Sequence, residues 1–248
     1  MNALITGVGR RAGIGYAIAR RLGGKGASLV VQSWAPADTA QPWGADPETV
    51  GALRAELPGT RVEHVAADFE DPDGPERLVA AASAALGHLD VLVVNHAHSS
   101  SYGLGELTAA EIDRALIVNV RAPLLLIQAF HARHDGREGG RIVLMTSGQH
   151  RGAMPGELPY VAGKGALHQL TRTLAAEVAD KRITLNAVDP GATDTGWASP
   201  ETYAAVLEQE PWRRWGEPDD AARLIAFLCS QDARWITGQV ITSSGGGP

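Results

Sequence analysis

Short apolar runs alternate with helix-like stretches along this chain, and this alternation constrains the fold more than any other feature. Such runs, bounded by Gly, Asp, Asn or Pro, are typical of buried strands. The predicted strands are 3–5, 28–31, 62–66, 91–94, 142–145, 184–188 and 239–241. Helical periodicity marks 15–22, 46–57, 75–86, 109–131, 159–179 and 219–230. Strands alternating with helices form right-handed βαβ units. The sequence therefore predicts an α/β, doubly wound Rossmann-type fold, with a seven-stranded parallel sheet and helices on both faces.

Composition is consistent with a single domain, 1–248, and argues against several classes of protein. The 248 residues are 44% hydrophobic and 20% charged, which suits one globular α/β unit. A net charge of −6 without a basic block argues against a nucleic-acid partner. No apolar run approaches the roughly 18 residues of a membrane span. Cys229 is the one cysteine, which excludes an internal disulfide and a cysteine-based metal cluster, and no metal site is predicted. Without a signal-like N-terminus, we expect a cytoplasmic protein.

Local patterns predict helix starts and two exposed loops. Thr108 followed by Glu111 forms a plausible capping box, and Asp219 is a candidate cap of the last helix. Residues 34–46 are rich in Pro, Ala and Asp and are interpreted as a loop. Residues 192–214 are interpreted as a long substrate loop, because loops of that length in compact domains are usually functional.

A glycine-rich turn follows the first predicted strand and opens the first helix. Gly7–Ala12 reads Gly-x-Gly-x-x-Ala, and Gly13, Ile14 and Gly15 follow. Glycines let a pyrophosphate approach the backbone, and a helix N-terminus offers free N–H groups to phosphates. This position predicts dinucleotide binding, although a glycine-rich turn without a ligand would share the pattern.

The tip of the second strand bears on which nicotinamide cofactor is used. NAD binders usually carry a carboxylate there for the ribose hydroxyls. Here the tip reads Gln32-Ser33-Trp34, with no carboxylate before Asp38. Arg10 and Arg11 in the turn could pair with a 2′-phosphate, although both could equally be solvated. The sequence therefore favours NADP(H), with NAD(H) possible.

Tyr160 and Lys164 combine a phenol and an ammonium on one face of a predicted helix, four residues apart. A neighbouring ammonium stabilises a phenolate, so Lys164 is expected to lower the Tyr160 pKa and make it a usable proton donor or acceptor. Ser147 follows a predicted strand, where its hydroxyl could hold a substrate carbonyl. Asn119 is an unusual polar residue in an apolar helix; a structural role for it remains an alternative.

These residues together resemble the short-chain dehydrogenase/reductase family in its compact form, over essentially the whole chain. The resemblance implies that Tyr160 is the general acid/base, that Ser147 orients the carbonyl, and that Asn119 holds a water that relays protons to Lys164. It implies that Lys164 and Tyr160 also contact the cofactor. The other expected cofactor contacts are Gly7, Arg10, Arg11, Gly13, Ile14, Gly15, Ser33, Asp68, Phe69, Asn95, Ala97, Pro190, Gly191, Thr193 and Thr195.

The sequence departs from this family's pattern at two places. The turn has five residues between Gly7 and Gly13, whereas three are usual in the family. The related enoyl reductases also have an enlarged turn. Those space the catalytic Tyr and Lys more widely, so the Tyr160–Lys164 spacing favours carbonyl over enoyl reduction. The usual Asn-Asn-Ala-Gly segment ends here in His98, which could contribute to binding or be an exposed loop histidine.

The substrate is an open question at the level of sequence. Residues 149–157 and 192–214 are expected to line a pocket for a small carbonyl or alcohol. The resemblance ranks 3-oxoacyl thioester reduction first and sugar or steroid alcohol oxidation as an alternative. A non-catalytic NADP-binding sensor would need no proton donor, which the intact Ser147, Tyr160 and Lys164 set weighs against. The resemblance also implies a homodimer or homotetramer packed through helices 109–131 and 159–179 and the last strand.

Overall fold

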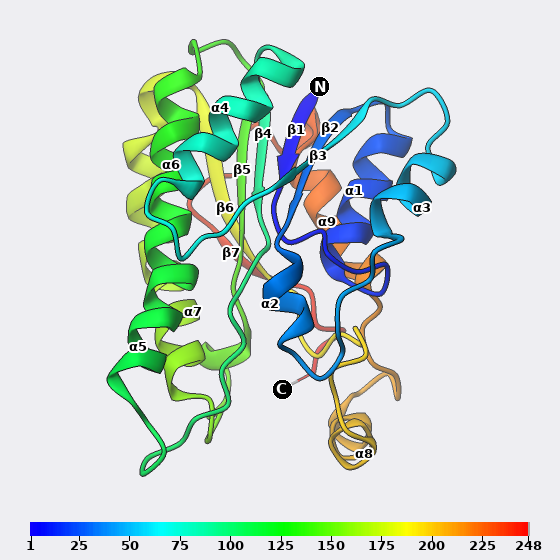
Figure 1. The fold of residues 1–248 in the computed structure, drawn as a ribbon, viewed down its shortest axis with the longest axis vertical. Coiled ribbons are helices and arrows are strands. Elements are labelled where there is room, and N and C mark those ends of the chain that lie inside the picture. The colour runs from blue at the N-terminus through cyan, green and yellow to red at the C-terminus, as the bar shows by residue number, and fades with distance from the viewer. Residues whose placement is uncertain (248) are drawn as a thin grey trace.

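The structure is a computed structural model that describes residues 1–247, and it contains one seven-stranded sheet (Figure 1). The strand order is β3-β2-β1-β4-β5-β6-β7, and every neighbouring pair is parallel. The predicted fold class is therefore confirmed. The strands are β1 (Asn2–Ile5), β2 (Ser28–Ser33), β3 (Val62–Ala66), β4 (Val91–Val94), β5 (Gly140–Met145), β6 (Ile183–Asp189) and β7 (Val240–Thr242).

Helices cover both faces of the sheet, which explains why its strands are apolar on both sides (Figure 1). Ala3 and Ile5 pack into one buried cluster, while Leu4 between them packs into the other. Helices α1, α3 and α9 lie over the first face, and α4 to α7 lie over the second. The helices are α1 (Ile14–Gly24), α2 (Ala35–Thr39), α3 (Thr49–Glu56), α4 (Gly74–Leu86), α5 (Ala109–Leu116), α6 (Ala122–Arg133), α7 (Leu158–Glu177), α8 (Pro200–Gln209) and α9 (Pro218–Leu228).

Three segments differ from their predicted structure. The stretch 109–131 is interrupted between α5 and α6 by a π-helical turn, Ile117–Arg121, and the helix continues to Arg133. Residues 34–46 contain α2, and residues 192–214 contain α8, so neither is wholly a loop. Both short helices begin with a proline in the first turn, where its fixed φ suits a helix and its missing N–H costs nothing.

The predicted caps are correct only in part. Thr108 accepts a hydrogen bond from the Glu111 backbone N–H, but the Glu111 carboxylate turns away to His98 instead of completing the box. The last helix is capped by Glu217, which forms a capping box with Asp220. Asp219 lies in the first turn, two residues beyond Glu217, and binds Arg21 and Arg223, because its side chain faces α1 rather than its own helix end.

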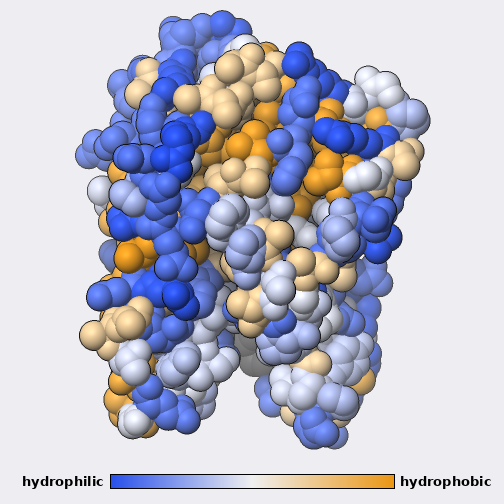
Figure 2. Space-filling model, in the orientation of Figure 1, coloured by the Kyte–Doolittle hydropathy of each residue, from blue (hydrophilic) through white to orange (hydrophobic). Residues whose placement is uncertain are grey.

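The parallel arrangement places the carboxyl ends of all seven strands at one edge of the sheet. At this end the surface is divided by a notch between the α5 and α8 sides of the molecule (Figure 2). By length and composition, the helical stretch Ala109–Arg133 is the one candidate for crossing a membrane among the described residues. In the fold it packs against α4 and α7, as the core helix of a globular protein does.

Candidate active site

The glycine-rich turn brings the backbone of β1 close to the start of α1. Gly7 has a φ of +72°, and a Cβ there would lie 2.8 Å from the Asn95 Nδ2 and from the His96 backbone. A Cβ on Gly15 would lie 2.3 Å from the Gly7 carbonyl oxygen. No side chain in residues 1–247 caps α1 at Gly13, and its first turn holds no acidic residue. These features leave an N–H-lined cradle that fits the pyrophosphate of a dinucleotide.

Two amide side chains lock this turn onto the neighbouring strands. Asn95, directly after β4, donates from Nδ2 to the carbonyl oxygens of Thr6 (3.1 Å) and Gly7 (3.0 Å). Gln32 accepts the Gly7 N–H at 3.0 Å and donates to the Ala67 carbonyl oxygen at 2.8 Å. Gln32 therefore ties the turn to the residues that follow β3.

The residues expected at the adenine end gather beside this turn. Ser33 ends β2, and its hydroxyl contacts His64 Nε2 at 2.9 Å. Asp68 follows β3, and its carboxylate accepts the Glu70 N–H, so it shapes the local turn. Phe69 is buried against the His96 ring, with centroids 4.0 Å apart. Ala97 is exposed beside Asn95.

The structure assigns other partners to the two arginines expected at the 2′-phosphate. Arg11 donates from Nε to Asp46 at 2.7 Å. Arg10 donates to the Thr195 carbonyl oxygen at 3.1 Å and lies over the Trp43 ring. Asp38 folds back toward Gly9, and burial raises the pKa of its carboxyl while Arg10 lowers it. Segment 34–46 folds over the turn and so brings Asp38, Trp43 and Asp46 beside the two arginines, and their pairing with a 2′-phosphate stays a prediction.

Ser147, Tyr160 and Lys164 converge at the carboxyl end of β5. Ser147 follows that strand, and Tyr160 and Lys164 lie in the first two turns of α7, where Pro159 starts the helix. Ser147 is close enough to the Tyr160 phenol to lower its pKa. The Lys164 Nζ lies 5.8 Å from the centre of the Tyr160 ring and donates to the Met145 carbonyl oxygen at 2.9 Å. The predicted triad is thus brought together.

Burial is the largest influence on the pKa values of Tyr160 and Lys164. It raises the pKa of Tyr160 to about 12, against a smaller lowering by Ser147. It also lowers the pKa of Lys164 to about 8. The expected lowering of the Tyr160 pKa by Lys164 is not found, because desolvation of the phenol is the largest effect and the carboxylates of Glu157 and Asp189 raise the pKa further. At neutral pH the phenol is protonated and the ammonium is charged.

Asn119 lies in the π-helical turn and is 1% exposed. Its Oδ1 accepts the His98 N–H at 2.7 Å, and its Nδ2 donates to the His98 carbonyl oxygen at 2.9 Å. A Cβ on Gly163 of α7 would lie 2.7 Å from the Asn119 Cβ, so the turn packs tightly beside Lys164. The His98 ring contacts Glu111 Oε1 at 2.8 Å and is therefore anchored to α5.

The residues expected at the nicotinamide end follow β6 in a single run. Gly191 has a φ of +65°, and a Cβ there would lie 2.6 Å from the Ser244 Cβ. The Thr193 hydroxyl donates to the carbonyl oxygens of Pro190 (3.2 Å) and Gly191 (3.3 Å). Thr195 offers its carbonyl oxygen to Arg10, which joins this run to the glycine-rich turn.

Sequence reasoning missed the buried pair Thr6 and His96. The Thr6 hydroxyl donates to His96 Nδ1 at 2.8 Å and accepts the Asn95 N–H at 3.0 Å. His96 Nε2 donates to the Val118 carbonyl oxygen at 3.1 Å, so the ring is neutral with its proton on Nε2. Burial, and then the charge of Lys164, lower the His96 pKa to about 3. The only sequence indication was a histidine in place of a usual asparagine.

The two segments expected to form the substrate pocket flank the triad. Arg151, in the first of these segments, pairs through Nε with the buried Asp189 carboxylate at 2.8 Å and donates to the Gly247 carbonyl oxygen. Both amide atoms of Gln149 are buried without a hydrogen-bond partner in residues 1–247. Trp212 is exposed, and Trp197 packs edge-on against Trp215. Trp197 therefore anchors the segment.

Comparisons with known proteins agree with this geometry. A family model described as enoyl-(acyl carrier protein) reductase matches residues 7–247. The uncharacterized oxidoreductase YjdA of Bacillus subtilis is 40% identical, over 98% of this chain and 95% of the relative. The chain belongs to the short-chain dehydrogenase/reductase family. This short-chain dehydrogenase/reductase is accordingly an oxidoreductase.

Solved structures of this family superpose over nearly the whole chain. A short chain dehydrogenase from Burkholderia cenocepacia in complex with NADP is 36% identical, with a TM-score of 0.86, covering 98% of this chain and 96% of that one. The angucycline C-6 ketoreductase LanV with bound NADP is 34% identical, with a TM-score of 0.86, covering 99% and 94%. Both of these neighbours bind NADP.

Proposed function

We propose that this short-chain dehydrogenase/reductase catalyses the NADPH-dependent reduction of a ketone to an alcohol, or the reverse. The observation that carries the proposal is the convergence of Ser147, Tyr160 and the buried Lys164 ammonium at the carboxyl end of β5. This arrangement places a proton donor, an oxygen-binding hydroxyl and a fixed positive charge at one point of the sheet edge. Proton transfer at an oxygen is the chemistry that a carbonyl–alcohol interconversion requires besides hydride transfer.

The residues that would hold the cofactor line the strand ends. The cradle at Gly7, Gly13 and Gly15 suits the pyrophosphate, and the run from Pro190 to Thr195 lies where the nicotinamide half would extend. NADPH supplies the hydride when bound. Preference for NADP(H) over NAD(H) is supported by the NADP-bound neighbours and by Arg10, the half-buried cation nearest the turn.

Each polar side chain of the site has a role in the proposed reaction. Ser147 donates to the substrate oxygen and holds it against the Tyr160 phenol. Because burial keeps that phenol protonated at neutral pH, Tyr160 donates its proton as the oxygen gains negative charge during reduction. Lys164 places its positive charge beside the Tyr160 ring and stabilises the phenolate left behind. Asn119 braces the chain next to Lys164 and is the proposed holder of a relay water.

We infer that the substrate is a ketone, with a 3-oxoacyl thioester as the first candidate and a sugar or steroid alcohol as the alternative. The similarity to the ketoreductase LanV supports a ketone. The matching family model carries an enoyl reductase description, but the four-residue spacing of Tyr160 and Lys164 favours the carbonyl reaction. The free amide of Gln149, two residues beyond Ser147, suits a substrate with a polar group near its carbonyl.

We also infer a cytoplasmic homodimer or homotetramer. The helices that would form its interface expose apolar side chains, among them Ile112, Leu116 and Leu158. Trp235, shortly before β7, is 95% exposed. Exposed apolar side chains of this size are typical of surfaces that a second subunit covers.

Removal of the Tyr160 hydroxyl tests the proposed reaction. Tyr160→Phe is expected to lower turnover of a ketone panel with NADPH by at least about a hundredfold, the scale of general acid catalysis. NADPH binding, followed by its fluorescence, is expected to change little. Tyr16→Phe is the matched control, because that hydroxyl donates to Glu56 on α3 and faces away from Ser147. Ketone reduction that survives Tyr160→Phe would contradict the proposed role of Tyr160.

A further inference from the structure

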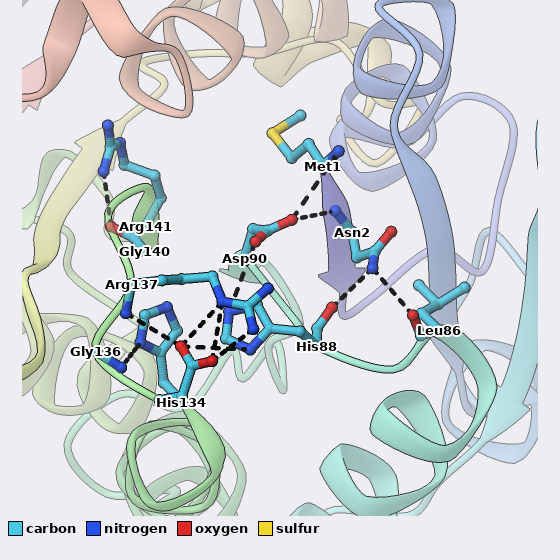
Figure 3. A network of polar contacts seen from close by, with 11 residues as sticks. Met1, Asn2, Leu86, His88, Asp90, His134, Gly136, Arg137, Gly140 and Arg141 are labelled. Atoms are coloured by element: carbon cyan, nitrogen blue, oxygen red, sulfur yellow. Dashed lines mark hydrogen bonds and ion pairs between the residues drawn. The ribbon is translucent and has the colours of Figure 1, made fainter.

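A second cluster of titratable side chains lies at the end of the sheet opposite Ser147 (Figure 3). His88 lies in the connection from α4 to β4, and His134 and Asp135 lie between α6 and β5. One ring nitrogen of each histidine and one Asp135 oxygen all lie within 4.8 Å of one another. Both connections enter strands at their amino ends, so this cluster is remote from the Tyr160 phenol.

The spacing of these atoms is close to that of a metal coordination sphere. His88 Nδ1 lies 3.9 Å from Asp135 Oδ1, and the two histidine ring centres are 4.7 Å apart. In a tetrahedral site with bonds of about 2.1 Å, ligand atoms are about 3.4 Å apart. Small side-chain rotations therefore bring the three ligand atoms around one ion.

Each imidazole has a buried nitrogen that lacks a hydrogen bond, while the His88 ring as a whole is partly buried and Asp135 is exposed. His134 is 3% exposed, and its Nε2 and that of His88 have no hydrogen-bond partner in residues 1–247. The nearest acceptor to His88 Nε2 is Asp90 Oδ1, at 3.6 Å. Because buried polar atoms are normally paired, two such histidines in contact with one carboxylate are an unusual arrangement for a purely structural cluster.

Other donors occupy the lone pairs that a metal ion would use. The Gly136 N–H donates to His134 Nδ1 at 3.1 Å, and the Arg137 guanidinium binds the Asp135 carboxylate, with 2.5 Å between Nη2 and Oδ2. Beside the cluster lies a hollow of about 400 Å³ lined by His88, His134 and Asp135 among others, which provides room for water. A cation that enters from this hollow would have to displace these donors.

We propose that His88, His134 and Asp135 bind a divalent transition-metal cation, with Zn²⁺ as the best chemical match. Two imidazole nitrogens and one carboxylate oxygen are a common zinc ligand set, and water from the hollow completes the tetrahedron. Mg²⁺ and Ca²⁺ match less well because they prefer oxygen ligands. The ion would join the entry to β4 to the end of α6, and so stabilise the fold without taking part in the reaction.

Arg137 allows the proposal to be tested by a variant that tightens metal binding as well as by variants that weaken it. Its guanidinium is a positive charge on a proposed ligand and competes with the cation for Asp135. Arg137→Gln removes that competitor and is expected to tighten metal binding at least about threefold. His88→Gln and Asp135→Asn each remove a ligand and are expected to weaken it at least about tenfold. His131→Gln is the matched control, because His131 lies near the same end of α6 but pairs with Asp180.

The experiment uses the full chain, stripped of metal with a chelator and dialysed. Zn²⁺ is titrated by calorimetry, and Co²⁺ by the visible absorption that tetrahedral cobalt shows. We expect one ion per chain, a higher Tm with Zn²⁺, and loss of both effects in His88→Gln and Asp135→Asn, with circular dichroism confirming that these variants fold. Absence of binding at micromolar Zn²⁺, or binding unchanged in both ligand variants, would overturn the proposal.

Discussion

The Asn119 side-chain amide makes two hydrogen bonds to the backbone of His98: it accepts the His98 N–H at 2.7 Å and donates to the His98 carbonyl oxygen at 2.9 Å. These two hydrogen bonds join the π-helical turn to the segment that follows β4. Asn119→Ala would leave these backbone groups without their partner in a nearly buried place. We expect a loss of about 1–3 kcal/mol in the free energy of unfolding, measured with urea, together with reduced turnover. Unchanged stability would show that water replaces the amide.

His96 is expected to make the fold acid-sensitive. Its pKa in the folded chain is about 3, against 6.5 for a free histidine, so between these values the unfolded chain binds the additional proton. The stability it contributes is complete above about pH 6.5 and falls as the pH drops, by about 1.4 kcal/mol per pH unit. His96→Asn is expected to show a shallower decline than the wild type in urea unfolding between pH 7 and pH 4.5. Parallel declines would argue against a neutral, buried His96.

Two glycines of α1 are expected to respond oppositely to alanine. In Gly15→Ala the new Cβ would lie 2.3 Å from the Gly7 carbonyl oxygen, so the cradle must open and NADPH affinity is expected to fall at least tenfold. In Gly24→Ala the Cβ would enter open space, and the helix is expected to gain up to about 1 kcal/mol. Fluorescence titration and thermal unfolding measure the two effects. Equal NADPH affinity in Gly15→Ala and wild type would contradict the cradle.

Arg10 is expected to distinguish the two nicotinamide cofactors. It lies half-buried between Trp43 and the Thr195 carbonyl oxygen, whereas Arg11 is exposed and paired with Asp46. A charge-assisted contact to a 2′-phosphate is worth about 1.5–3 kcal/mol, so Arg10→Gln is expected to weaken NADPH binding at least tenfold and NADH binding little. Arg11→Gln is the control, with a smaller effect. Tighter NADH than NADPH binding by the wild type would reverse the cofactor assignment.

The association state is expected to exceed one subunit. Static light scattering at micromolar concentration is expected to give the mass of a dimer or tetramer of the 26.1 kDa chain. Trp235→Asp places a charge on the most exposed tryptophan and is expected to shift the mass downward if the surface near β7 is covered. A monomer mass for the wild type would contradict the inference.

The sequence predicted the sheet well because its strands are buried on both faces and read as uninterrupted apolar runs. The bounds of β3 and β4 agree fully with the prediction; β1, β2 and β5 differ by one or two residues at one end, and β6 and β7 by one residue at each end. Ser147, Tyr160 and Lys164 could be placed together because their spacing relative to β5 and α7 is local.

Features that depend on distant segments could not be predicted in this way. The π-turn at Asn119 has the composition of an ordinary helix, and its packing against Gly163 is a tertiary contact. The Arg11 pairing with Asp46 spans 35 positions without any periodic pattern. The pKa of Tyr160 was misjudged because the sequence shows the neighbouring charge but not the depth of burial.

The strand order has a consequence for how activity appears as the chain folds. The site draws on residues from Thr6 to Thr195, and β1 pairs with β4, which is nearly ninety positions away, before β5 and β6 can extend the sheet. Contacts so distant in sequence form late, after the loops between them have closed. During refolding, helical circular dichroism should therefore recover first, and the ability to enhance NADPH fluorescence only after the central strands have joined.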